Sequence, residues 1–153
     1  MHNLSELLQN EVLICSLVSW FIAQVLKIPT YLLVEKELNW RRFFGSGGMP
    51  SSHTSFVVAL TLMTGFDAGF QSVAFAIAFT LAAIVMYDAM GVRRAAGEQA
   101  EAINELREKI SEDQVEEDPF PEWGKPLREA LGHKPTEVIS GAILGIAVSF
   151  LAF

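Results

Sequence analysis

Two short stretches contain residues suited to phosphate chemistry. The stretch PSSH at residues 50–53 joins two hydroxyls to a histidine, and GHKPTE at residues 132–137 places Glu137 four residues after His133. On a helix this spacing puts both side chains on one face, where the carboxylate can orient the imidazole. A histidine held in this way keeps one ring nitrogen available to attack phosphorus. The spacing therefore predicts a nucleophilic His133 with Glu137 as its partner.

Prolines and glycines around these stretches predict helix starts that bind anions. We expect Pro50 and Pro135 each to open a helix, because the first helical turn loses nothing when a proline lacks its N–H. Gly47 and Gly48 would let a ligand approach the backbone closely. The exposed start of the first of these helices would attract an anion through outward-pointing backbone N–H groups. These groups belong to Ser51, Ser52 and His53.

Charged residues elsewhere extend the candidate site. Arg93 and Arg94 would supply fork-shaped donors for phosphate oxygens, although paired arginines after a membrane span also act as topology anchors. Lys27 lies inside an apolar stretch, where a charge is a functional candidate unless the side chain snorkels to the interface. Asp88 is a supporting candidate that could equally cap a helix or pair with an arginine.

Four apolar stretches must position these residues, at 12–34, 55–66, 71–90 and 138–153. The first and third reach the roughly 20 residues that a membrane-crossing helix needs, whereas the second and fourth are shorter. GFDAGF, at residues 65–70, predicts a tight turn between the second and the third. If all four cross in alternation, PSSH, YDAMGVRR and GHKPTE meet at the same membrane face. A re-entrant hairpin at residues 54–66 is the alternative, and it would break this alternation.

Composition supports a membrane protein with a single domain at residues 1–153. Hydrophobic residues make up 51% of the chain, and the mean hydropathy is +0.33. The formal net charge of −7 arises mainly from residues 98–122 and says little about charge beside the apolar stretches. The one cysteine, Cys15, excludes an internal disulfide and is expected to pack. Because the start lacks Lys and Arg, we expect no cleaved signal peptide.

The chain becomes charged beyond residue 90 but keeps an apolar period. Apolar residues recur there at helical intervals, namely at Val92, Ala96, Ile103, Leu106 and Ile110. This pattern predicts an amphipathic helix that projects from the third span. Residues 111–126 combine acidic residues with prolines and predict an acidic surface linker. The predicted fold is an all-α integral membrane bundle of about four membrane helices with a projecting amphipathic helix.

At these motifs the chain resembles the divergent branch of the type 2 phosphatidic acid phosphatase superfamily, which is related to acid phosphatases and vanadium-dependent haloperoxidases. The resemblance runs through AQVLK, GGMPSSH, YDAMGVRRAAGEQA and LGHKPTEVISGAILG, nearly the whole chain. In the superfamily a PSGH motif supplies phosphate contacts and an acid histidine, and PSSH matches it with Ser52 in place of glycine. The HxxxD part of a later motif matches His133 and Glu137, with glutamate in place of aspartate.

The chain departs from the superfamily pattern in two respects. The motif KxxxxxxRP has no match, and Arg128 stands one residue too near His133 and has no serine before it. The superfamily core also has six helices, so a homo-oligomer that completes the site is one alternative. Residues that could replace the missing phosphate ligands are Lys27, Arg41, Arg42, Arg93 and Arg94.

The residues and the resemblance together predict a membrane phosphatase that acts on a phosphorylated lipid or polyprenyl phosphate. His133 would attack phosphorus, Glu137 would hold the imidazolium, and His53 would protonate the leaving oxygen. The arginines and the Ser51/Ser52 helix end would stabilise charge on the phosphoryl oxygens. We expect no cofactor and no nucleic-acid partner.

Three other interpretations of the same residues stay open. A metal site could form from His53, Asp88, His133 and Glu137. A noncatalytic membrane protein could use the basic rim to bind anionic lipid head groups or to support assembly. A small channel or transporter ranks last, because the spans contain few polar residues.

Basic residues also predict how the chain is oriented in the cell membrane. Lys and Arg near span ends are enriched on the cytoplasmic side. The face that carries the motifs has all of these residues, and the opposite face has none, so we predict a cytoplasmic site with both termini outside. The basic residues of the motif face are Lys36, Arg41, Arg42, Arg93, Arg94, Arg128 and Lys134.

Overall fold

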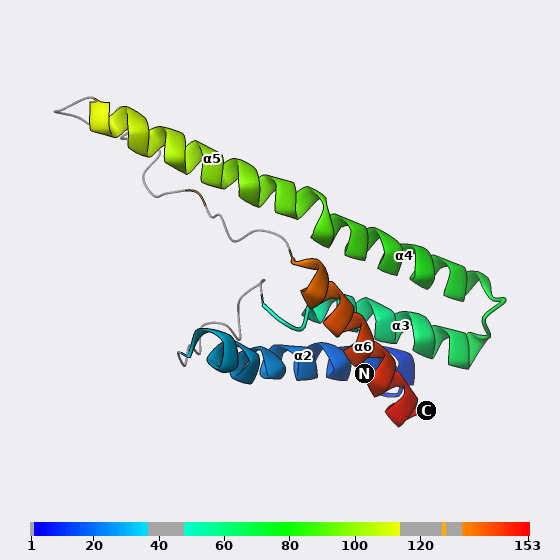
Figure 1. The fold of residues 1–153 in the computed structure, drawn as a ribbon. Coiled ribbons are helices and arrows are strands. Elements are labelled where there is room, and N and C mark those ends of the chain that lie inside the picture. The colour runs from blue at the N-terminus through cyan, green and yellow to red at the C-terminus, as the bar shows by residue number, and fades with distance from the viewer. Residues whose placement is uncertain (1, 37–47, 114–126, 128–132) are drawn as a thin grey trace.

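The computed structural model describes residues 2–36, 48–113, 127 and 133–153, and the elements within these ranges are all helices. The all-α prediction is therefore confirmed for the described chain (Figure 1). The helices are α1 (His2–Leu8), α2 (Glu11–Glu35), α3 (Ser52–Ala68), α4 (Val73–Met90), α5 (Val92–Asp113) and α6 (Pro135–Ala152).

Helix α3 is the centre of the bundle and contacts α2, α4 and α6 (Figure 1). Hydroxyl groups join it to two of these neighbours. The Oγ atoms of Ser19 on α2 and Ser55 on α3 lie 2.6 Å apart, and Thr61 Oγ1 donates to the carbonyl of Ala78 on α4 at 3.1 Å. Such side chains let membrane helices approach closely and bond across the contact.

Three helical stretches are long and apolar enough to cross a membrane, at Glu11–Leu33, Val73–Lys109 and Pro135–Ala152. They correspond to the first, third and fourth predicted spans, and the protein is a multi-pass membrane protein. Helix α3, with 17 residues, is not among them. The count of four membrane helices therefore stays a prediction.

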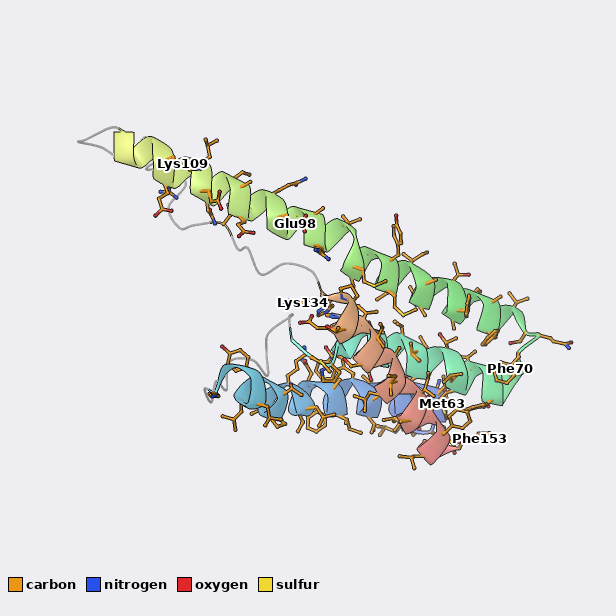
Figure 2. All side chains as sticks on the ribbon, viewed as in Figure 1. Met63, Phe70, Glu98, Lys109, Lys134 and Phe153 are labelled. Atoms are coloured by element: carbon orange, nitrogen blue, oxygen red, sulfur yellow. The ribbon has the colours of Figure 1, made fainter. Side chains whose placement is uncertain are left out.

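The two ends of α3 lie beside the two ends of α6. At one end the Ser51 N–H donates to the carbonyl of Glu137 at 2.9 Å, and at the other the rings of Phe66 and Phe153 lie 4.6 Å apart. Figure 2 shows Phe153, Met63 and Phe70 near the second end and Lys134 at the first. Because α3 runs alongside the whole of α6, this course favours an α3 that crosses the membrane and argues against a re-entrant hairpin.

The predicted turn at residues 65–70 is wrong at its start. Helix α3 continues through Gly65 to Ala68 and is capped by Gly69, which has φ 89°. A Cβ added at Gly65 would lie 2.5 Å from the ring of Phe70. Gly65 therefore makes room for an aromatic side chain and does not break the helix.

The prediction of a helix projecting beyond the third span is confirmed. Helix α5 continues from the end of α4 and extends away from the bundle (Figure 1). It runs through Asp113, three residues into the stretch predicted as a linker, and residues 114–126 lie outside the described chain. The Asn104 amide both donates to the Leu127 carbonyl and accepts from its N–H, at 2.9 and 3.0 Å.

Candidate active site

His133 and Glu137 form a buried pair at the start of α6. Helix α6 begins at Pro135, as the sequence predicts, which places Glu137 in its first turn. Nδ1 of His133 lies 2.8 Å from Oε2 of Glu137, and the side chains are only 6% and 15% exposed. Because a carboxylate can only accept, the hydrogen of this bond lies on Nδ1, and in a neutral imidazole Nε2 then carries the lone pair. The imidazole is thus held in the tautomer that a nucleophile requires.

The backbone of His133 is also held. Its N–H donates to the carbonyl of Ala89, near the end of α4, at 2.9 Å. A backbone hydrogen bond to the end of α4 therefore fixes the position from which the His133 side chain extends. Asp88, the neighbour of Ala89, is half-buried at the same end of the bundle.

The start of α3 differs from the prediction. Pro50 precedes the helix, and Ser51 is the N-cap, with its Oγ accepting from the backbone N–H of Thr54 at 3.4 Å and from the Thr54 hydroxyl at 3.1 Å. The Ser51 N–H donates to the Glu137 carbonyl, so it does not point outward as predicted. The reason is that serine is a strong N-cap and that α6 supplies an acceptor.

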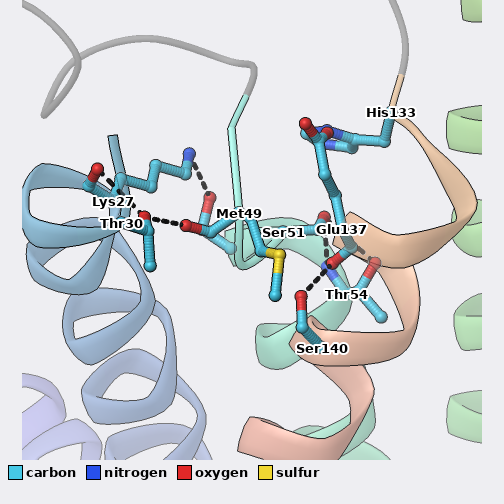
Figure 3. A network of polar contacts seen from close by, with 9 residues as sticks. Lys27, Thr30, Met49, Ser51, Thr54, His133, Glu137 and Ser140 are labelled. Atoms are coloured by element: carbon cyan, nitrogen blue, oxygen red, sulfur yellow. Dashed lines mark hydrogen bonds and ion pairs between the residues drawn. The ribbon is translucent and has the colours of Figure 1, made fainter. Parts of the chain in front are cut away.

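Lys27 brings a positive charge from α2 to the start of α3. The side chain is 2% exposed, and Nζ donates to Oγ of Ser52 at 3.3 Å. Figure 3 shows Lys27 on one side of the α3 start and the His133–Glu137 pair on the other. Lys27 therefore turns into the bundle and does not snorkel away from it.

His53 lies next to His133. It is exposed in the first turn of α3, and the centroids of the two imidazoles are 6.3 Å apart with the ring planes tilted by 47°. The two predicted motifs, far apart in the sequence, thus present their histidines to each other at one end of the bundle.

The other predicted site residues are placed less directly. The side chain of Arg94 is 57% exposed, and its Nε pairs with Oε1 of Glu98 on the same helix at 3.0 Å. Arg93 lies in the first turn of α5. Gly48 has φ 100° and lies against Lys27, where an added Cβ would be 3.8 Å from Cγ. Arg42 and Gly47 lie outside the described residues.

The alternative metal site is not assembled in the described part of the chain. Within those residues no group of three or more His, Cys, Asp or Glu side chains is arranged to hold a metal ion. Among these residues, His133 and Glu137 form a hydrogen-bonded pair, and the ring of His53 lies beside that of His133. This arrangement is suited to proton transfer and nucleophilic attack.

Several residues of the site were not found from the sequence. The Thr30 hydroxyl contacts the carbonyl of Met49 and holds the segment before PSSH against α2 (Figure 3). Gly141 lies against the Ser51 carbonyl and brings α6 onto the start of α3. The spacing of Gly141 and Gly145 in an apolar helix is the small-residue pattern of membrane helix contacts, and it could have identified them.

Comparisons with known proteins identify the family of the chain. A protein of Bacillus subtilis (strain 168), named "Uncharacterized membrane protein YuiD", is 41% identical over 151 residues, covering 95% of this chain and 96% of that protein. No solved structure matches the chain. The model of the family described as "Divergent PAP2 family" matches residues 8–148, and the chain therefore belongs to the divergent PAP2 family of type 2 phosphatidic acid phosphatase relatives.

Proposed function

We propose that the protein is an integral membrane phosphatase that hydrolyses a phosphorylated lipid or isoprenoid. The observation that carries this proposal is the His133–Glu137 pair, buried and bonded at 2.8 Å, beside His53 and across the α3 start from the buried Lys27. A nucleophile with its orienting carboxylate, a proton donor and a cation are the groups that phosphoryl transfer through a phosphohistidine requires.

The proposed reaction has two steps. In the first, Nε2 of His133 attacks phosphorus, the bond from phosphorus to the lipid oxygen breaks, and His53 gives its proton to that oxygen. In the second, a water attacks the phosphohistidine, His53 takes a proton from the water, and phosphate leaves with His133 restored. Glu137 accepts a hydrogen bond from the Nδ1–H of His133 in both steps and stabilises the imidazolium.

Charge that develops on the phosphoryl oxygens would meet preformed positive groups. Lys27 is the cation that the described structure places against the α3 start, through Ser52. The helix starts of α3 and α6 also meet there, and the N-terminal end of a helix carries partial positive charge. Preorganised groups of this kind typically contribute about 10²-fold or more each to the rate.

The membrane setting supports a lipid substrate. The histidines lie at helix ends, and α6 is one of the stretches long enough to cross the bilayer. A lipid phosphate in the same membrane would present its head group at the level of such helix ends while its chains stay among the exposed apolar side chains of the bundle.

Phosphate release from a panel of phospholipid and polyprenyl phosphates by the purified protein tests the proposal. We expect release from at least one member, inhibition by vanadate as a mimic of five-coordinate phosphorus, and no effect of a chelator. Folded protein that binds these lipids and releases no phosphate would favour the noncatalytic alternative. Activity lost in chelator and restored by a divalent ion would favour metal-dependent chemistry.

His53→Ala should slow lipid substrates far more than substrates with a good leaving group. Only a poor leaving group needs a proton as the bond to phosphorus breaks, and such a proton contributes about 10²- to 10⁴-fold. The measurement is kcat/KM for a lipid phosphate and for an aryl phosphate in the variant and the wild type. His2→Ala, in α1, is the matched control and should match the wild type. Equal losses for both substrates would show that His53 has a structural role.

A further inference from the structure

Helices α3 and α6 touch through their backbones at two glycines. A Cβ added at Gly141 would lie 2.4 Å from the carbonyl oxygen of Ser51, and one at Gly145 would lie 2.7 Å from that of Ser55. Neither oxygen belongs to a flexible side chain that could move aside. A side chain at either position would therefore push α6 away from α3.

The contact at Gly141 joins the two halves of the site. The His133–Glu137 pair belongs to the start of α6, whereas the Lys27–Ser52 bond and His53 belong to α2 and α3. Gly141 lies one turn beyond Glu137, and its neighbour Ser51 immediately precedes Ser52. Each half is held internally by its own hydrogen bond. The halves are joined by the bond from the Ser51 N–H to the Glu137 carbonyl and by the close approach of Gly141 to the Ser51 carbonyl.

We propose that Gly141 is a positioning residue, whose missing side chain sets the distance between the nucleophile His133 and the phosphate-binding groups Lys27 and Ser52. This inference rests on the phosphatase function proposed above. A displacement of about 1 Å between reacting groups can cost about 10²-fold in rate, and a bound phosphate must touch both halves at once. The Ser51 N–H to Glu137 carbonyl bond, at 2.9 Å, would be strained first.

Gly141→Ala should therefore lower kcat/KM at least about 100-fold for lipid and aryl phosphates alike. The expected result differs from that for His53→Ala, which should affect mainly the lipid substrate. A good leaving group can depart without a proton, but it cannot compensate for a nucleophile that is out of position. Vanadate, which also bridges the two halves, should inhibit the variant at a concentration at least about tenfold higher. The test measures both quantities, and thermal unfolding, in purified protein.

Gly145→Ala is the matched control. It meets a backbone oxygen at 2.7 Å and Val58 Cβ at 3.0 Å, so its packing conflict is similar, but it lies one helical turn further from the site. We expect the two variants to lose similar stability and Gly145→Ala to stay within about threefold of the wild type in kcat/KM and vanadate inhibition, since the Ser51–Glu137 contact can persist.

The outcomes separate this inference from the function on which it rests. Full activity in Gly141→Ala, or equal losses in both variants, would overturn the positioning role while the phosphatase stands. Failure of Gly141→Ala, or of both variants, to fold would show that the glycines serve folding, and would overturn it equally. A folded wild-type protein that releases no phosphate from any substrate would overturn the function itself.

Discussion

His133→Ala is expected to abolish phosphate release while the protein stays folded in the membrane. The substitution removes the nitrogen that attacks phosphorus, and loss of a nucleophile should lower kcat by at least about 10³-fold, about 4 kcal/mol of transition-state stabilisation. The fold should survive, because the backbone bond from the His133 N–H to the Ala89 carbonyl does not depend on the side chain. Phosphate release and thermal unfolding of the purified variant check both expectations.

Two further variants sharpen this prediction. Glu137→Gln keeps the shape of the side chain but removes the charge that stabilises the imidazolium, and it should cost at least about 100-fold in kcat. His2→Ala, a substitution in α1, is again the control and should have no effect. In the wild type, an acid-labile phosphoryl group should be trapped on the protein and be absent from His133→Ala. Full activity in that variant would exclude the proposed mechanism.

The second large effect concerns the side of the membrane on which the site lies. We expect a cytoplasmic site, because Lys and Arg near span ends favour the cytoplasm. In the described chain Lys36 caps the end of α2, Lys134 caps the start of α6, and Arg94 lies in the first turn of α5. Asp67 lies at the other end of α3, next to the turn into α4. If the chain follows the usual bias, α5 projects into the cytoplasm and the α3–α4 turn faces outward.

Single cysteines can test this orientation in intact cells. In a Cys15→Ser background, a cysteine in place of Ala68 should react with an impermeant thiol reagent, and one in place of Ser111 should be protected until the membrane is opened. Ala68 is exposed at the end of α3, and Ser111 lies in the last turn of α5. Labelling of both after permeabilisation is the control. The reverse pattern would place the phosphatase on the outer face.

The sequence predicted best what depends on neighbouring residues. The His133–Glu137 contact follows from a spacing of four residues at a helix opened by Pro135, and no distant part of the chain is needed to form it. The apolar stretches at 12–34, 71–90 and 138–153 correspond in the same way to α2, α4 and α6, because hydrophobic length determines which segments can cross a bilayer.

The predictions that were wrong required knowledge of a tertiary partner. Pro50 has the backbone chemistry of a first helical residue, yet Ser51 caps α3 because its N–H finds the Glu137 carbonyl on α6. Gly65 looks like a turn residue, yet α3 continues through it to Ala68, and its missing side chain leaves room for the ring of Phe70.

By itself the sequence indicated the long apolar helices, the polar clusters and the His133–Glu137 pair, because each of these rests on local spacing and hydrophobic length. Only the tertiary structure decided that Lys27 reaches Ser52 and that His53 lies beside His133. The physical reason is that such approaches depend on how closely whole helices cross. That closeness is set by small side chains, such as Gly141 against Ser51 and Ser19 against Ser55, whose partners a single sequence does not reveal.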